Sequence, residues 1–490
     1  MQVYKKLFEH QRHAVSKMFS AGKIGALYME MGTGKTLTSF EIIAKYGFAR
    51  VLLVVPKALM DSWQEQLDEH TDREYVYIKW DSVKATSIAW MRIWDSLKWT
   101  NHWEGRTAFF CVNVEALQNA DKYGRLRNAD LAQKLKEFCV GDTLLIIDEA
   151  SKVKSPTANR SKALANIARL CSHRLMLTGT EITNSPLDLY MPWYILDQAF
   201  WAEKNFFLWR ARYSIIVNRT LSGGRSYPEI IGYRDLDRLM QKIEPFTFRA
   251  KKADCLDLPE KIFVTMHIDL SAPEKAAYKQ LKRELMVSIE QGTFELDNRQ
   301  ALFAKFRQLT GGFFLDECGT AWRVGRSKID ALFADLEDTD EQAIIFAVHR
   351  ADIESIATYL NDAIDKKRWS YATYYGDDDD KARAEAIEAH RSGAARLLIA
   401  NPACAGYGLN LQHCHLVYWY SLPTSPEIVW QAEDRIHRPG QHSPCVYKRL
   451  IARGTIDERL EELLANKKSL ASALSSNDID AIKALCGGEF

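Results

Sequence analysis

Short apolar runs alternate with longer segments of helical periodicity along this 490-residue chain. The runs Ile24–Tyr28, Thr143–Ile147 and Leu416–Tyr420 do not alternate apolar with polar residues, which is typical of strands buried in a parallel sheet. Segments such as Leu37–Tyr46 instead have the pattern of a helix. Repeated strand-to-loop transitions between helical segments predict the α/β class, with parallel sheets flanked by helices.

A glycine-rich segment, Met29-Glu-Met-Gly-Thr-Gly-Lys-Thr36, separates the first apolar run from the helix that follows it. A phosphate-binding loop needs this context, because glycines let successive N–H groups and the helix N-terminus point at an anion. Lys35 would then neutralise the β- and γ-phosphates of a nucleotide, and the Thr36 hydroxyl would bind Mg2+. The short form Gly-x-Gly-Lys-Thr also arises by chance and in small-molecule kinases, so alone it leaves these alternatives open.

Two adjacent carboxylates, Asp148 and Glu149, follow the apolar run at residues 143–147. Acids at the carboxyl end of a buried parallel strand face the ligand crevice of the sheet. We therefore expect Asp148 to hold Mg2+ and Glu149 to orient and deprotonate an attacking water, because phosphoryl transfer depends mainly on positioning and charge stabilisation. A solvated acidic turn is the alternative.

Composition narrows the class of protein without identifying a partner. With 47% hydrophobic and 26% charged residues the chain is typical of soluble globular proteins, and nine scattered cysteines suit a reducing compartment. The first residues lack the apolar core of a signal peptide, and the apolar runs are strand-sized, so we expect a cytoplasmic location and no membrane partner. The net charge is +1, so any nucleic-acid-binding surface must be local.

Two residue clusters could suggest other chemistry, but each has a simpler explanation. Five tryptophans crowd one stretch of the chain: Trp80, Trp90, Trp94, Trp99 and Trp103. They could form a base-stacking platform, but Trp90 and Trp94, like Trp99 and Trp103, are spaced as on one face of a helix, which favours packing. The segment His413-Cys-His415 lacks a second ligand pair at zinc-like spacing and leads into an apolar run, which favours the start of a strand.

Together the motifs resemble those of the Swi/Snf-type ATPases of helicase superfamily two, over nearly the whole chain. The most specific string, Gln431-Ala-Glu-Asp-Arg-Ile-His-Arg438, resembles motif VI of that family. The other similar segments are an opening element (6–11), motifs Ia, Ib and III (54–63, 110–115 and 177–184), a basic segment (248–252), and motifs IV and V (342–346 and 405–410). The resemblance implies two RecA-like lobes, each a parallel sheet flanked by helices, with helical insertions.

The resemblance also implies how the chain is divided. We expect an ATP-binding lobe with a helical protrusion over residues 1–260, a helical insertion or linker over 261–325, and a C-terminal lobe with a helical tail over 326–490. The two lobes use the whole chain, so it resembles a bare, monomeric motor of bacterial or viral type. Such a motor would lie in the nucleoid or, for a viral protein, in the host cytoplasm.

Individual site residues follow from the same resemblance. The residues implied in ATP binding are Gln11, Gly32, Thr33, Gly34, Lys35, Thr36, Gly408 and Gln431, with Gln11 at the adenine edge. The implied catalytic residues are Lys35, Asp148, Glu149, Arg435 and Arg438, with Thr36 and Asp148 as the metal ligands. The implied DNA contacts are Lys57, Arg249, Lys251, Lys252 and Arg383. Arg438 matches the arginine finger for the γ-phosphoryl group, Arg435 supports it, and a helical motif VI would place both on one face with Gln431.

One departure from the family pattern affects the expected function. Ser151 stands where the motif Asp-Glu-x-His has its histidine, which leaves open how the nucleotide site is coupled to motif VI. We expect a DNA-dependent ATPase that uses ATP and Mg2+, translocates on double-stranded DNA and remodels protein–DNA or branched DNA structures. The alternatives are a strand-separating helicase on DNA or RNA, and a weakly hydrolysing, ATP-gated DNA clamp.

Overall fold

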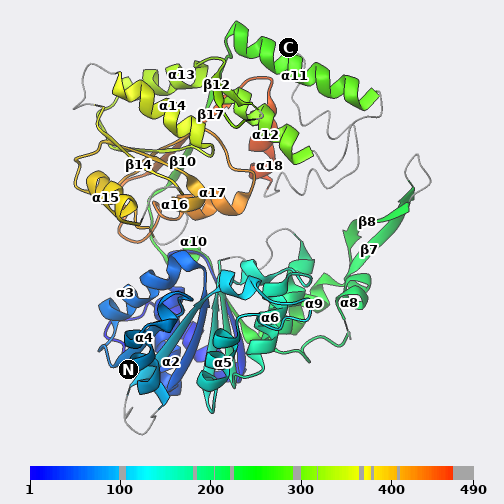
Figure 1. Cartoon of the computed structure of the whole chain (residues 1–490), viewed down its shortest axis with the longest axis vertical. Coiled ribbons are helices and arrows are strands. Elements are labelled where there is room, and N and C mark those ends of the chain that lie inside the picture. Colours follow the sequence, from blue (N-terminus) through cyan, green and yellow to red (C-terminus); the bar gives the residue numbers. More distant parts are fainter. Residues whose placement is uncertain are drawn as a thin grey trace. The chain divides into compact units, whose positions relative to one another are not determined.

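The computed structural model describes residues 1–490 except 99–105, 180–184, 204, 221–225, 291–298, 317, 363–368, 377–379, 406–408 and 467–490. The chain divides into two compact units, Met1–Leu256 and Asp257–Phe490 (Figure 1). Each unit is built on one parallel sheet, with seven strands described in the first and six in the second. Helices flank both sheets, which confirms the predicted fold of two RecA-like lobes.

The first sheet has the strand order β3-β4-β2-β5-β6-β1-β9, and all of its neighbouring strands are parallel. Its strands are β1 (Ile24–Met29), β2 (Arg50–Val55), β3 (Tyr75–Lys79), β4 (Thr107–Asn113), β5 (Thr143–Asp148), β6 (His173–Thr178) and β9 (Thr247–Ala250). The helices packed around it are α1 (Glu9–Ala21), α2 (Lys35–Tyr46), α3 (Met60–His70), α4 (Ile88–Lys98), α5 (Ala129–Phe138), α6 (Asn159–Ala168) and α7 (Tyr190–Leu196). Because the strands are parallel, every loop that follows a strand begins at the same edge of the sheet.

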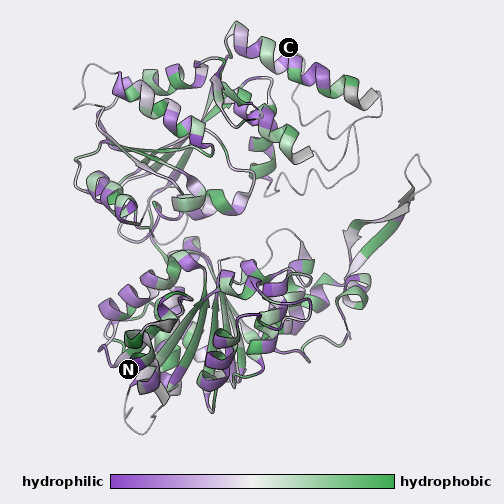
Figure 2. Ribbon diagram, viewed as in Figure 1, coloured by the Kyte–Doolittle hydropathy of each residue, from purple (hydrophilic) through white to green (hydrophobic). Residues whose placement is uncertain are grey.

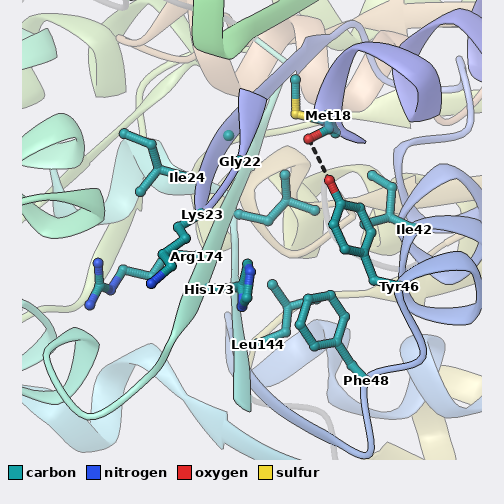
Figure 3. Close-up of a pocket in the computed structure, with 12 residues that line it drawn as sticks. Met18, Gly22, Lys23, Ile24, Ile42, Tyr46, Phe48, Leu144, His173 and Arg174 are labelled. Carbon is teal, nitrogen blue, oxygen red and sulfur yellow. Dashed lines mark hydrogen bonds between the residues drawn. The ribbon is translucent and has the colours of Figure 1, made fainter. Parts of the chain in front are cut away.

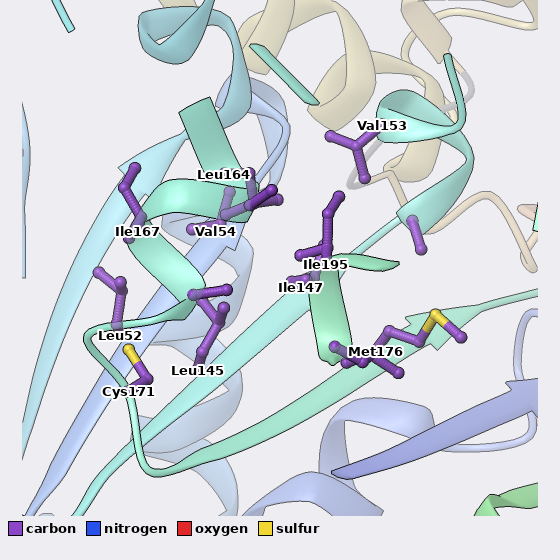
Figure 4. Packing of buried hydrophobic residues seen from close by; sticks show 14 of the residues in the cluster. Leu52, Val54, Leu145, Ile147, Val153, Leu164, Ile167, Cys171, Met176 and Ile195 are labelled. Atoms are coloured by element: carbon purple, nitrogen blue, oxygen red, sulfur yellow. The ribbon is translucent and has the colours of Figure 1, made fainter. Parts of the chain in front are cut away.

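One face of this sheet packs on α4, α5, α6 and α7 in a continuous apolar core. Val54 and Ile147 of the strands meet Leu164 of α6 and Ile195 of α7 (Figure 4). Apolar residues concentrate on the strands, whereas the helices also carry polar residues (Figure 2). Helices cover both faces of a parallel sheet, so its strands are apolar on both sides, as the unbroken apolar runs predicted. Burial of these side chains drives the packing of the helices on the sheet.

The tryptophan-rich stretch belongs to the same core. Trp80, Trp90 and Trp94 are buried, and the rings of Trp90 and Trp94 stack with their centroids 5.4 Å apart. Trp94 also contacts the ring of Phe110 on β4 at 4.9 Å. The packing interpretation is therefore confirmed for these three residues, while Trp99 and Trp103 lie outside the described residues.

A two-stranded ribbon interrupts the helical segments near the end of the first unit. The elements of this region are α8 (Phe206–Tyr213), β7 (Ser214–Thr220), β8 (Ser226–Tyr233), α9 (Leu236–Ile243) and α10 (Lys252–Cys255). Strands β7 and β8 are antiparallel, whereas the part of residues 1–260 that protrudes from the lobe was expected to be helical. The run Ile215-Ile-Val217 is rich in β-branched residues, which favour a strand over a helix.

The second sheet has the order β10-β17-β16-β13-β15-β14, again with parallel neighbours. Its strands are β10 (Lys261–Ile268), β13 (Ala343–Phe346), β14 (Tyr371–Tyr374), β15 (Leu397–Ala400), β16 (Leu416–Trp419) and β17 (Cys445–Ala452). The other elements are α11 (Ala272–Glu290), α12 (Arg299–Thr310), β11 (Phe313–Leu315), β12 (Ala321–Arg323), α13 (Ser327–Glu337), α14 (Arg350–Asn361), α15 (Asp380–Arg391), α16 (Pro402–Ala405), α17 (Pro426–Glu433) and α18 (Ile456–Ala465). The span 261–325, expected to be helical, thus contributes β10 to the sheet, because β10 pairs with β17 along eight residues.

Two further expectations can be compared with these elements. β16 begins at Leu416, immediately after His413-Cys-His415, which confirms the strand start predicted there. Within the described ranges, no helix combines the length and the apolar character needed to cross a membrane.

A buried polar cluster lies at the carboxyl ends of β13, β16 and β17. Lys328 Nζ lies 2.6 Å from Asp457 Oδ2, and Ser421 Oγ donates to Asp352 Oδ2 at 2.8 Å. Asp352 is fully buried, and its Oδ1 has no hydrogen-bond donor among the described residues. Burial raises the pKa of Asp352 to about 6, although Ser421 and Lys328 act in the opposite direction. Burial also lowers the pKa of the nearby His349 to about 4.

These shifts predict a pH-dependent stability that Asp352→Asn should alter. Between about pH 4 and pH 6 the folded chain keeps Asp352 protonated while the unfolded chain ionises it, so this group lowers the stability as the pH rises. His349 has the opposite effect on stability in this range, but the wild type and the variant both contain His349, so its effect is the same in the two proteins. We expect the difference in unfolding free energy between the variant and the wild type to shift by about 2–3 kcal/mol in favour of the variant from pH 4 to pH 7. Urea unfolding across this range measures the difference, and parallel pH profiles would contradict it.

Candidate nucleotide site

The phosphate loop connects β1 to α2 and depends on two glycines. Gly32 and Gly34 have φ values of 83° and 86°, which L side chains rarely adopt. A Cβ on Gly34 would also lie 1.9 Å from Gln11 Nε2. Helix α2 begins at Lys35, and neither a capping side chain nor an acidic residue occupies its first turn. Its first N–H groups and its dipole therefore suit an anion such as a nucleotide phosphate.

Gln11 holds this loop from the side of α1. Its side chain is buried, Nε2 donates to the Thr33 carbonyl at 3.1 Å, and Oε1 accepts from the Phe8 N–H at 2.8 Å. His10 Nε2 lies 2.8 Å from the same Thr33 oxygen. The loop conformation is thus tied to residues more than 20 positions earlier in the chain. The contact of His10 was not predicted from the sequence, because no motif at this position assigns a role to a histidine.

The last strand of the first sheet holds the loop from the other side. The Glu30 N–H donates to the Ala250 carbonyl at 3.0 Å, and the Lys252 N–H donates to Glu30 Oε2 at 2.7 Å. Lys35 Nζ donates to the Met29 carbonyl at 2.8 Å. Residues on β1 and β9 therefore position the loop, and nothing in the sequence near residue 30 indicated the pairing with residues 250–252.

The two predicted carboxylates lie at the carboxyl end of β5, at the same sheet edge as the phosphate loop. Asp148 Oδ2 accepts from Trp63 Nε1 at 2.9 Å, and Oδ1 accepts from the Glu149 N–H at 3.0 Å. Glu149 is buried and has a positive φ of 54°, a conformation that costs energy for a side chain other than glycine. Such strain at the end of a strand points to a functional position. The role of Trp63 was not predicted, although it ends the segment that resembles motif Ia.

Motif VI lies in the second unit and is not a continuous helix. α17 ends at Glu433, so the expectation that Gln431, Arg435 and Arg438 share one helical face was wrong. After α17 the chain continues in turns, in which the Arg435 and Ile436 N–H groups donate to the Ala432 and Glu433 carbonyls. Pro439 disfavours helical backbone at Arg438, the residue before it. Gln431 is buried in α17, whereas the two arginines lie in the turns that follow.

The two arginines are held by the loop that resembles motif V. The Leu411 N–H donates to the Arg435 carbonyl at 3.0 Å, and Arg438 donates to the Leu409 carbonyl at 3.4 Å. Burial lowers the pKa of Arg438, and the charge of Arg435 lowers it further. Gly408 lies outside the described residues.

The predicted DNA contacts are spread over both units. Lys57 and Lys251 are exposed and follow β2 and β9, and Arg249 is exposed at the end of β9, where it pairs with Glu244. These three lie at the edge of the sheet that carries the phosphate loop. The side chain of Lys252 is buried. Arg383 lies half-buried on α15 of the second unit, and Ser151 lies in the short helix Ala150–Val153 that follows Glu149.

A small cavity at the opposite edge of the first sheet is a packing feature. It lies beside the first residues of β1, β5 and β6, among Met18, Tyr46, Phe48 and His173 (Figure 3). The Tyr46 hydroxyl donates to the Met18 carbonyl at 2.7 Å across it. Its volume of about 20 Å³ admits a water molecule or two, so it cannot hold a nucleotide.

Two parallel-sheet lobes, the first with a phosphate loop and an Asp-Glu pair at one sheet edge, define the class of helicase-type ATPases. The chain belongs to the SNF2-related family: the SNF2-related domain matches residues 10–310, and the helicase conserved C-terminal domain matches residues 327–440. This confirms the resemblance to the Swi/Snf-type ATPases and places the chain among the ATP-hydrolysing enzymes of helicase superfamily two.

Individual relatives are distant. The chain is 28% identical to the chromatin-remodeling ATPase INO80 of Candida albicans over 285 residues, which is 56% of this chain and 19% of that protein. It is 25% identical over 354 residues to the p41 protein of Acyrthosiphon pisum secondary endosymbiont phage 1, covering 68% of this chain and 73% of the phage protein. A solved SWI2/SNF2 ATPase core of Sulfolobus solfataricus in complex with dsDNA has 19% identity and a TM-score of 0.42, covering 100% and 98% of the two chains. The chain spans 19–35% of the length of the first three curated relatives.

The geometry of the loop predicts that Gly34→Ala weakens nucleotide binding while Gly47→Ala does not. Both glycines have positive φ, so each alanine should cost the fold about 1–2 kcal/mol. Only at Gly34 does the new Cβ meet a neighbour, whereas nothing lies within 4 Å of a Cβ at Gly47. We expect at least about a tenfold loss of affinity for a fluorescent ATP analogue, or about 1.4 kcal/mol, in the first variant alone. Equal affinities in the two variants would refute this.

Proposed function

We propose that this chain is a DNA-dependent ATPase that translocates on double-stranded DNA and remodels protein–DNA or branched DNA structures. One observation carries the proposal: an uncapped helix N-terminus with Lys35 and Thr36 lies at the same sheet edge as Asp148 and Glu149, in a member of the SNF2-related family. The Candida relative is named a chromatin-remodeling ATPase, which supports an activity on DNA.

The first unit would bind the nucleotide. Gly32–Thr36 would hold the phosphates through backbone N–H groups and Lys35, and Gln11 would read the adenine edge beside the loop that it supports. Thr36 and Asp148 would hold Mg2+, and Trp63 would keep Asp148 in place by donating to Oδ2. Glu149 would orient the attacking water and accept its proton.

The second unit would complete the reaction. We propose that Arg438 stabilises the charge that develops on the γ-phosphoryl group and that Arg435 supports it, with Gln431 and Gly408 contributing to ATP binding. Support comes from the hydrogen bonds that join motif VI to Leu409 and Leu411, and from the charge of Arg435, which adds to burial in lowering the pKa of Arg438. An anionic partner would relieve this repulsion.

DNA would be bound through its phosphates. Lys57, Arg249 and Lys251 are exposed at the edge that carries the phosphate loop, and a basic surface of this kind binds a duplex without reading its sequence. Arg383 would add a contact from the second unit. Lys252 has a buried side chain, so its contribution would come through the backbone that joins β9 to Glu30.

The first test of this function is the ATPase rate alone and with blunt duplex DNA, single-stranded DNA or RNA. We expect strong stimulation by blunt duplex, because only a bound duplex should bring the arginines of the second unit to the nucleotide. A preference for single strands or RNA would favour the strand-separating helicase. No stimulation by any of them would favour the weakly hydrolysing clamp, the alternative that Ser151 suggests.

Arg438→Ala should lower duplex-stimulated turnover by about 10³–10⁵-fold, as loss of an arginine finger does. ATP affinity should change little, because the phosphate loop lies in the other unit. Arg391→Ala removes an exposed arginine of the same unit and serves as the matched control. Steady-state kinetics at saturating ATP and DNA compare the two, and normal turnover in Arg438→Ala would refute the role of Arg438.

A further inference from the structure

The first unit contains a second, larger cavity that the proposed ATP chemistry does not use. Residues of α6, α7 and the start of α8 line it, and its volume of about 410 Å³ is within the range of small-ligand sites. No phosphate-loop residue lines it, and neither do Asp148 and Glu149. Five of its lining residues are aromatic: Tyr123, Tyr190, Tyr194, Phe206 and Phe207.

The aromatic rings form a fixed floor and an exposed rim. Tyr190 and Tyr194 stack with centroids 5.8 Å apart and planes 12° apart, and the ring of Phe206 meets Tyr190 edge-on at 5.2 Å. Tyr190 is buried, so the floor is held by the core beneath it. Tyr123 and Phe207 are 63% and 66% exposed, so they form the solvent-facing rim of the cavity. Rings arranged in this way offer surfaces on which a flat ligand group can stack.

Positive charge surrounds the exposed rings. Lys162 of α6 and Arg169, the residue that follows the end of α6, both line the cavity. Lys122 Nζ and the Arg125 guanidinium lie 5.1 Å and 5.8 Å from the ring of Tyr123, and Arg210 lies 5.8 Å from the ring of Phe207. None of the described residues that line the cavity carries a carboxylate. The cavity therefore suits a ligand that combines a flat ring with negative charge.

Two amide side chains are held so that their oxygens can accept hydrogen bonds. Asn166 Nδ2 donates to the carbonyls of Tyr123 and Gly124 at 3.0 Å and 3.1 Å, and Gln198 Nε2 donates to the Ala165 carbonyl at 3.0 Å. The nitrogens are thus engaged by backbone, which leaves the amide oxygens as acceptors. Gly124 packs so closely on α6 that a Cβ there would lie 2.5 Å from the backbone of Lys162, so the loop with Tyr123 is fixed against the helix.

We propose that this cavity binds one unpaired nucleotide of a DNA strand. The base would stack against the rings, its amino and imino groups would donate to the amide oxygens, and its phosphate would lie near Lys162 and Arg169. An acidic peptide would use the cations, but it would leave the stacked floor and the amide acceptors unused. The inference rests on the proposed function, since a motor that remodels branched DNA meets unpaired nucleotides at the branch.

The test measures binding of fluorescent dT12 and of a blunt duplex to the full chain by anisotropy. Arg169→Glu and Tyr123→Ala should each weaken dT12 binding by about tenfold, in line with the loss of one stacking or phosphate contact. Arg92→Glu and Tyr4→Ala make the same chemical changes at other exposed positions of the first unit and should have no effect. ATPase stimulation by blunt duplex should be the same in all four variants.

A photocrosslink on the wild-type chain tests the site without any variant. dT12 that carries 5-iododeoxyuridine should crosslink to peptides that contain Tyr123, Tyr194 or Phe207. Crosslinks found only elsewhere, or unchanged dT12 affinity in Arg169→Glu and Tyr123→Ala, would overturn the proposal.

Further arms separate the other ligands and the other proposal. If free dTMP displaces dT12 at a similar concentration of nucleotide, the ligand is a mononucleotide and the proposal of a DNA strand is overturned. If the variants lose more affinity for a Glu-Tyr copolymer than for dT12, the ligand is an acidic peptide and the proposal is likewise overturned. If blunt duplex does not stimulate the wild-type ATPase, the proposed function fails, yet the dT12 measurements still decide the cavity. If it does stimulate while the variants bind dT12 normally, the cavity proposal alone fails.

Discussion

Parallel strand pairing is the constraint on which the candidate site depends. Because the seven described strands of the first sheet run in one direction, the phosphate loop after β1 and the carboxylates after β5 emerge at one edge, although more than 100 residues separate them. The helices between the strands have to cross back over the sheet, and they bury both of its faces as they do so.

Its place at the sheet edge alone would not fix the conformation of the loop. Residues near the two ends of the first unit supply the contacts that fix it. Gln11 and His10 contact the loop from α1, and Ala250 and Lys252 contact it from β9. The two segments are about 240 residues apart in the chain, so the loop geometry reports whether the whole unit has folded. The segment that includes Arg249 and Lys251 is thereby joined to the glycine-rich loop by one hydrogen bond between backbone groups and one to the Glu30 side chain. These bonds link a candidate DNA surface to the candidate nucleotide site.

Aromatic side chains have two different roles within the first unit. Trp80, Trp90 and Trp94 are buried and contribute to stability, as helical spacing indicated. The rings around the second cavity are stacked on the core at one end and exposed at the other, and cations lie beside the exposed ones. Residue type alone cannot separate these roles, because both use aromatic side chains. Burial and the charge around each ring separate them.

The sequence by itself determined the fold class, the phosphate loop, the Asp-Glu pair and the family, because each depends on local pattern: apolar runs, glycine spacing and charge at a strand end. Tertiary structure alone decided that Trp63 holds Asp148, that Glu30 joins β9 to the loop, that β10 completes the second sheet and that α17 ends before Arg435. It also decided which rings and cations share a cavity. These features depend on contacts between residues far apart in the chain, and local periodicity carries no information about them.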